Sequence, residues 1–237
     1  MPYILSPLIK EQFAGYWLEG EPYSRKSIYE IRPGKLPPVN YDAHTLKPHS
    51  LTHAEGARHV ESAGKTVDQY FADPNFFYGP CVVVKLKGNG YKSIDKDKGI
   101  FHWEVTKTEL DLALKEILKQ NPMPPKVLVT TEHYPTNSDG FHDPDYVLTL
   151  SQEAADYLVS FPNFNLYGTS WKSSDFKPGS GDRPIHKTLF KKAIVFELLD
   201  LKVVPPGEYF FCGFPLRLNN SSESPVTPVL FNFHEIR

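Results

Sequence analysis

The run His49-Ser-Leu-Thr-His53-Ala-Glu55-Gly-Ala-Arg-His59 places three histidines and one glutamate within eleven positions. Neutral imidazoles and a carboxylate are ligands that first-row transition metals accept. A bound metal makes hydroxide available at neutral pH, so a metal here would favour a hydrolase over a passive scaffold. The chain also has nine histidines among 237 residues, and a surface loop can hold such a cluster without a metal. Spacing alone leaves both interpretations open.

The spacing of this run requires irregular backbone if the side chains are to share an ion. On a straight strand His49 and His53 would stand ~13 Å apart. On an α-helix these two histidines would meet, but Glu55 would point away from them. We therefore expect a loop or a sharply bent strand end, and Gly56 suits such a turn.

When several metal ligands come from one loop, residues on a more rigid element usually complete the coordination. His186 and Glu197 are the candidates we favour for this role. Glu197 lies inside the apolar segment Ala193–Leu201, where a carboxylate is costly to bury unless it is paired or coordinated. The alternation of that segment equally allows Glu197 to face solvent on an amphipathic strand. Among the other histidines, His133 and His142 flank a turn-rich segment and are expected at the solvated surface.

The composition describes one folded domain without a nucleic-acid partner. The length suits a single domain over residues 1–237, or at most a compact pair. With 40% hydrophobic and 14% aromatic residues, the chain can build a full core. A net charge of −2 with mixed signs gives no basic footprint for nucleic acid.

The localisation signals indicate a soluble cytoplasmic protein. Cys81 and Cys212 lie in apolar runs and are expected to be free thiols in a reducing compartment rather than a disulfide. The first residues show no signal peptide, and no apolar run approaches the ~20 residues that span a bilayer.

Helix and strand signals alternate along the chain. Thr106 and Glu109 form a capping box before a run of leucines that ends at Asn121, and Ser151 caps a second helix; a shorter helix is expected at 66–71. One strand is expected near Ser27–Ile31. Further strands rich in Val, Ile, Phe and Tyr are expected at Pro80–Lys87, Lys126–Glu132, Asn165–Ser170, Ala193–Leu201, Glu208–Phe214 and Pro228–His234. This order favours an α/β or α+β fold with a central mixed sheet.

Motifs for covalent catalysis are absent from the sequence. There is no Gly-x-Ser-x-Gly elbow and no glycine-rich phosphate loop, and neither cysteine has a histidine near it in the chain. The segment Gly179-Ser-Gly181 is expected to be a flexible loop only. These absences favour metal-assisted hydrolysis over a covalent mechanism.

The run from His49 to His59 resembles the His-x-Gly-Thr-His-x-Asp-x-Pro-x-His signature of the cyclase family of metal-dependent hydrolases, which includes bacterial kynurenine formamidase and isatin hydrolase. The likeness extends over residues 1–232 in matching order. Its other segments are Phe77–Pro80 with Val82–Val84, Val127–Thr131, Leu150–Leu158, Asn165–Asp175, His186–Leu189, Glu197 and Val203–Tyr209.

The resemblance implies a swivelling β/β/α fold, a homo-oligomeric state that is most simply a dimer, and a site with one or two Zn²⁺ or Mn²⁺ ions. The implied ligands are His49, His53, Glu55, His186 and Glu197, with Glu55 as the bridge between two ions. His59 would be the acid/base that protonates the departing nitrogen after hydroxide attack.

The sequence departs from the family pattern in and near the site. Leu51 stands where glycine is usual, and Glu55 replaces aspartate. Ser170 and Trp171 replace an aspartate and a small residue. Arg58 lies between Glu55 and His59, where it either pairs with an acidic substrate or, as we favour, points to solvent. These changes indicate a divergent branch.

The function implied by the resemblance is hydrolysis of an amide, lactam or lactone of a small aromatic substrate, as in an arylformamidase. Two alternatives remain open: a metal-dependent cyclase or dehydratase for polyketide-like substrates, and a non-catalytic binding protein that has lost its metal. Aromatic residues for an apolar pocket wall, most of them expected in the ordinary core, are Phe13, Trp17, Phe76, Phe77, Tyr78 and Trp171.

Overall fold

A nine-stranded mixed sheet forms the centre of the computed structural model, which describes residues 1–17, 19–176 and 181–236. The strand order is β1-β14-β12-β5-β8-β10-β11-β4-β13. The four central strands β5, β8, β10 and β11 run parallel, and the flanking pairs are antiparallel. The strands are β1 (Tyr3–Ile4), β4 (His53–Glu55), β5 (Tyr78–Leu86), β8 (Lys126–Thr131), β10 (Leu166–Thr169), β11 (Ile194–Glu197), β12 (Gly207–Cys212), β13 (Glu223–Pro225) and β14 (Val229–Phe231).

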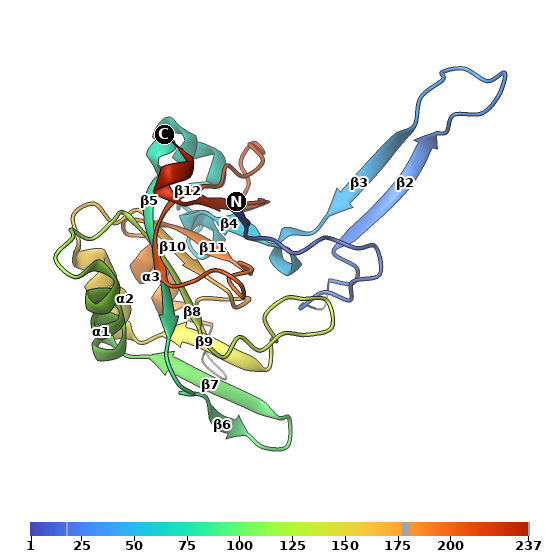
Figure 1. The fold of residues 1–237 in the computed structure, drawn as a ribbon. Helices are drawn as coiled ribbons and strands as arrows, with labels where there is room; N and C mark the ends of the chain where they lie inside the picture. Colours follow the sequence, from blue (N-terminus) through green and yellow to red (C-terminus); the bar gives the residue numbers. More distant parts are fainter. Residues whose placement is uncertain (18, 177–180, 237) are drawn as a thin grey trace.

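Two helices lie where the capping signals predicted them (Figure 1). Helix α1 (Lys107–Leu118) begins at Thr106, whose hydroxyl accepts from the Glu109 amide at 3.2 Å while Glu109 accepts the Thr106 amide at 2.8 Å. Helix α2 (Gln152–Ser160) begins at Ser151, which accepts from the Ala154 amide. The short helix α3 (Pro184–Leu189) was not predicted, and the helix expected at 66–71 is the 3₁₀ helix η3 (Val67–Ala72).

Both faces of the central sheet are buried, as predicted from the continuous apolar runs. On β5, Val82 and Val84 pack into the cluster that includes residues of α1 and α2. Cys81 and Val83 point to the opposite face and pack into the second cluster. Cys81 is fully buried and Cys212 half-buried, and both are free thiols in the described structure, which confirms that expectation.

Two smaller sheets flank the main one. Strands β6 (Lys92–Asp95), β7 (Ile100–Val105) and β9 (Tyr146–Leu150) form a three-stranded sheet. Strands β2 (Tyr23–Tyr29) and β3 (Tyr41–Leu46) form a hairpin that projects from the body of the protein (Figure 1). Of these strands, β2 overlaps a strand range predicted from sequence, and the alternation of Phe101, His102 and Trp103, which also indicates a strand, falls in β7. No helix in the described residues is long and apolar enough to cross a bilayer, and the loop expected at Gly179–Gly181 lies mostly outside the described residues.

His142 is buried, so the expectation of a solvated surface position was wrong for this residue, although His133 is exposed as expected. The segment folds back on itself, and His142 Nε2 donates to the Tyr146 carbonyl at 3.0 Å while Nδ1 lies 2.9 Å from the Ser170 hydroxyl. Burial lowers the pKa of His142 to about 4. The turn-rich sequence gave no sign of this tertiary packing.

We expect acidification to destabilise the protein through His142. Because its pKa is lower in the folded than in the unfolded chain, the unfolded chain binds the proton first, and stability falls as the pH drops from about 6.5 toward 4. The shift corresponds to about 3 kcal/mol lost between pH 7 and pH 4. Urea titrations should show a correspondingly smaller loss for His142→Gln than for the wild type or for His133→Gln. An identical pH dependence in all three proteins would contradict the assignment.

Candidate metal centre

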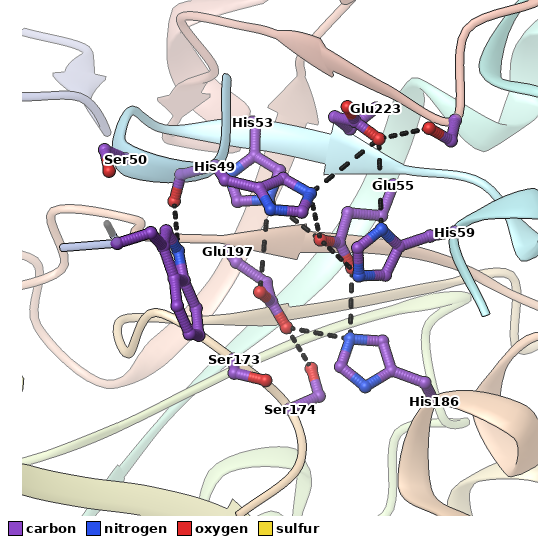
Figure 2. Close-up of polar contacts among 12 residues, drawn as sticks. His49, Ser50, His53, Glu55, His59, Ser173, Ser174, His186, Glu197 and Glu223 are labelled. Carbon is purple, nitrogen blue, oxygen red and sulfur yellow. Dashed lines mark hydrogen bonds and ion pairs between the residues drawn. The ribbon is translucent and has the colours of Figure 1, made fainter. Parts of the chain in front are cut away.

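Pairing between β4 and β11 brings three of the expected ligands together (Figure 2). In the antiparallel register, Glu197 at the carboxyl end of β11 lies opposite His53. His53 and Glu55 are two residues apart and leave the strand on the same face, while Ala54 between them enters the opposite core. All three side chains are buried. The solvent-facing alternative for Glu197 is therefore wrong.

Hydrogen bonding fixes which nitrogen His53 presents to the site. Its Nδ1 lies 2.8 Å from the Leu51 carbonyl, to which it donates. Its Nε2 is thereby turned to the carboxylates, 3.0 Å from Glu55 Oε1 and 4.0 Å from Glu197 Oε2. Metal-binding histidines usually donate their second ring N–H to a carbonyl or carboxylate in this way.

Asp175 positions His186, which comes from a segment 131 residues beyond Glu55. The Asp175 carboxylate accepts the backbone amides of Ile185 and His186 in the first turn of α3, at 2.9 and 3.0 Å, and the His186 Nδ1–H at 2.5 Å. His186 Nε2 then lies 3.0 Å from Glu55 Oε2 and 3.2 Å from Glu197 Oε1. The Ser174 hydroxyl donates to Glu197 Oε1 at 2.7 Å. The structure thus brings His186 together with Glu55 and Glu197.

His49 and His59 complete the cluster from irregular backbone on either side of β4. They lie in the 3₁₀ helices η1 (Pro48–Ser50) and η2 (Ala57–His59), so the run is neither a straight strand nor an α-helix, as the spacing required. Their Nε2 atoms stand 3.7 and 3.5 Å from Glu55 Oε1. Among the described residues, His49 Nε2 is a buried atom without a hydrogen-bond partner. Arg58 is exposed and donates to the Ser62 carbonyl, as expected for a solvent-facing residue.

Glu223 is a member of this cluster that the sequence did not reveal. It lies on the edge strand β13, opposite Glu55 in the register with β4. Its Oε2 stands 3.7 Å from His49 Nε2 and 3.8 Å from His59 Nδ1, and these imidazoles hold the pKa of Glu223 well below its usual range. The surrounding polar run, 219–224, has no motif that would have pointed to this role.

The buried groups form strongly paired charges. Burial by itself would raise the pKa of Glu55, but the imidazoles of His186 and His53 outweigh it and hold that pKa well below the usual value. Burial by itself would lower the pKa of both histidines, but their carboxylate partners raise it. A divalent cation can replace the protons that these histidines carry, because metal binding releases protons from its ligands.

The donor atoms fall into two groups that share one carboxylate. His49, Glu55 and His59 form one group with ligand atoms within 4.8 Å of one another, and His53, Glu55 and Glu197 form the other. Imidazole nitrogen and carboxylate oxygen suit Zn²⁺ and Mn²⁺. The buried His49 Nε2 has no hydrogen-bond partner, and a metal ion would satisfy it. The residues therefore fit a divalent metal, and Glu55 is the residue that belongs to both groups.

Two adjoining cavities give access to the centre. A small one of about 80 Å³ is lined by His49, Glu55, His59 and Glu197 together with Trp17. A larger one of about 290 Å³ shares Trp17, Lys172, Ser173 and Arg183 with it as lining residues. Of the aromatic residues considered as pocket wall, Trp17 and Trp171 line this larger cavity. Phe13 and Phe77 belong to the core, as expected for most of the set.

The curated proteins that are similar to this chain include several kynurenine formamidases. No family model matches the chain. The chain is 28% identical over 209 residues to the kynurenine formamidase of Polaromonas naphthalenivorans, covering 88% of this chain and 81% of that one. It is 29% identical over 193 residues to that of Salinibacter ruber, covering 81% and 80%. These similarities, each over more than four fifths of the chain, support the resemblance to the cyclase family of metal-dependent hydrolases.

Solved structures share the fold of this chain. A potential metal-dependent hydrolase with cyclase activity superposes with a TM-score of 0.70 at 23% identity, covering 98% of both chains. Isatin hydrolase A from Labrenzia aggregata superposes with a TM-score of 0.72 at 18% identity, covering 98% of this chain and 93% of that one. The predicted α/β fold with a central mixed sheet is confirmed.

We expect Asp175→Asn to weaken metal binding by ~10–100-fold, because the amide cannot accept three N–H groups and orient His186 as the carboxylate does. Competition with a chromogenic chelator measures this change. Asp156→Asn, an exposed position on α2, is the matched control. Wild-type affinity in a well-folded Asp175→Asn protein would contradict the role given to Asp175.

Proposed function

We propose that the protein is a metal-dependent amidohydrolase of the arylformamidase type, which cleaves an amide, lactam or lactone of a small aromatic substrate. The observation that carries the proposal is the convergence of four histidines and two glutamates around one small cavity. The kynurenine formamidase relatives and the aromatic wall of the adjoining cavity support an aromatic amide as substrate.

We assign the metal ligands as His49, His53, Glu55, His186 and Glu197, holding one or two Zn²⁺ or Mn²⁺ ions. When bound, the metal polarises the substrate carbonyl and lowers the pKa of water so that a nucleophile exists at neutral pH. Glu55 offers Oε1 to the His53 side and Oε2 to the His186 side. Asp175 and the Leu51 carbonyl keep the second nitrogens of His186 and His53 protonated, which leaves both Nε2 lone pairs free for the metal.

His59 is the group we assign to proton transfer. Its side chain is 16% exposed and lines the small cavity, so it reaches both solvent and the space in which a substrate would bind. Glu223 Oε2 lies 3.8 Å from its Nδ1, which leaves Nε2 on the side of the cavity. His59 can then donate from Nε2 to the leaving nitrogen of a cleaved amide.

The assembly and location of the protein complete the proposal. We propose one domain over residues 1–237, a homodimer and a cytoplasmic location. The two free thiols of the described structure are consistent with a reducing compartment.

Metal analysis combined with a hydrolysis screen tests the proposed function. Protein purified gently and reconstituted with Zn²⁺ or Mn²⁺ should carry at least one ion per chain and should hydrolyse formyl-anilides, isatin or small lactones. Retention of less than about one ion per chain would instead favour a non-catalytic binding protein. A metal-loaded protein that converts polyketide-like substrates but none of these compounds would favour the cyclase alternative.

We expect His59→Gln to lower kcat on a formyl-anilide by ~10²–10⁴-fold, the usual contribution of a general acid, while the metal content stays unchanged. His44→Gln, on the projecting hairpin, is the control and should behave as the wild type. Kinetics and elemental analysis on the same preparations give both quantities. Loss of metal in His59→Gln would show that His59 is a ligand with His49 and Glu55 rather than an acid.

A further inference from the structure

Glu223 lies against the candidate metal centre without belonging to either group of donor atoms that the described residues form. Its Oε2 is within ion-pair distance of two imidazoles, 3.7 Å from His49 Nε2 and 3.8 Å from His59 Nδ1 (Figure 2). Among the described residues, no lysine or arginine forms an ion pair with it. The two imidazoles are therefore the groups on which this carboxylate can act.

The backbone fixes Glu223 relative to His59. The Gly56 amide donates to the Ser222 carbonyl at 2.9 Å. Gly56 is the residue before η2, which carries His59, and Ser222 is the residue before Glu223. The Ser222 hydroxyl also donates to Glu223 Oε2. One interstrand hydrogen bond thus joins the two backbone segments, and a neighbouring hydroxyl holds the carboxylate oxygen that faces the imidazoles.

The His59 ring stands between two carboxylates. Its Nε2 lies 3.5 Å from Glu55 Oε1 and its Nδ1 lies 3.8 Å from Glu223 Oε2. A neutral imidazole has one N–H, and the acceptor to which it donates determines which nitrogen carries the proton. At 3.8 Å the Nδ1 contact is longer than a hydrogen bond, but contacts of this kind often shorten when a substrate binds.

Metal binding would leave His59 as the imidazole donor to Glu223. His49 Nε2 is assigned above as a metal ligand, and a nitrogen that binds a metal carries no proton. It could then donate nothing to Glu223, although it lies at 3.7 Å. Glu55 would likewise have its oxygens engaged by the metal. The His59 Nδ1–H is the donor that remains for Glu223, and the His59 Nε2 lone pair then faces the cavity.

We propose that Glu223 is a positioning residue for His59: its carboxylate accepts the Nδ1–H, fixes the ring and selects the tautomer with a free Nε2. The reaction itself rests on the proposed function. There, Nε2 accepts a proton from the attacking water and delivers it to the leaving nitrogen as the carbon–nitrogen bond breaks, so the ring ends in its starting state. A carboxylate on the other ring nitrogen keeps Nε2 in place during both transfers.

A double-mutant cycle tests whether Glu223 acts through His59. We expect Glu223→Gln, which keeps the shape and removes the charge, to lower kcat on a formyl-anilide at least ~10-fold with little change in KM. In a His59→Gln background the same substitution should change kcat by less than ~2-fold, because no ring is left to orient. Glu61→Gln, an exposed carboxylate just after η2, is the control and should have no effect in either background. An equal loss from Glu223→Gln in both backgrounds would indicate a structural role and overturn the proposal.

The affinity for Zn²⁺ distinguishes positioning from ligation. Competition with a chromogenic chelator should give Glu223→Gln and the wild type the same affinity within ~2-fold, because Glu223 is not needed as a ligand. A loss of affinity of ~10-fold or more in a folded Glu223→Gln protein would make Glu223 part of the ligand set and would overturn the positioning role.

The tautomer of His59 is a readout that needs no reaction. In Zn²⁺-loaded protein with ¹⁵N-labelled histidine, long-range ¹H–¹⁵N spectra distinguish Nδ1–H from Nε2–H, and the His59→Gln spectrum assigns the signals. We expect Nδ1–H as the main neutral form in the wild type and a smaller share of it in Glu223→Ala. This result is expected even if no amide is hydrolysed, in which case the reaction assignment fails and the pair stands. Nε2–H as the main form in the wild type, or an unchanged share in Glu223→Ala, would refute the inference.

Discussion

One buried carboxylate, Glu55, holds the centre together. An isolated carboxylate in the interior is costly, so it persists only with partners that offset the lost hydration. Glu55 has His53 on one oxygen and His186 on the other, both at 3.0 Å. The two histidines come from different parts of the chain, so their contacts with one carboxylate tie α3 to β4 (Figure 2).

Support for this arrangement extends outward through the backbone. The Leu51 carbonyl orients His53, and Asp175 orients His186 and closes the first turn of α3. The β4–β11 register sets Glu197 opposite His53. The same contacts that stabilise the fold here therefore determine where a cation can bind. The extra methylene of Glu55, relative to aspartate, is accommodated with both oxygens in contact with imidazoles.

Much of the fold was predictable because local signals agreed with tertiary structure. The caps at Thr106 and Ser151 mark helix starts, and the apolar runs around Val82 and Val127 mark strands buried on both faces. Strands β3, β6 and β9 were not assigned from sequence, since their residues are mixed in polarity or lie near turn signals. Strand β4 was not predictable either, because it has only three residues and pairs with β11 and β13, which are distant in the chain.

The candidate site was only partly predictable for related reasons. Glu197 was predicted because a carboxylate inside an apolar strand is costly to bury without a partner. His186 was predicted because it follows a loop that could bring it to the other ligands. Glu223 carried no such signal, since its role arises from the pairing of β13 with β4. Asp175 lies in a segment recognised by resemblance, but its contact with His186 depends on where α3 begins. Lys172 and Arg183 are ordinary surface residue types, and only the cavities reveal their position.

Anomalous diffraction from crystals loaded with Mn²⁺ or Zn²⁺ is the most direct test of a cation held at Glu55. The structure leads us to expect a peak with His53 Nε2, His186 Nε2 and oxygens of Glu55 and Glu197 among its neighbours, with a second ion, where present, on the His49 side. Ligand distances should be ~2.0–2.2 Å. At saturating metal, a peak elsewhere in the protein, or none within reach of Glu55, would contradict the account.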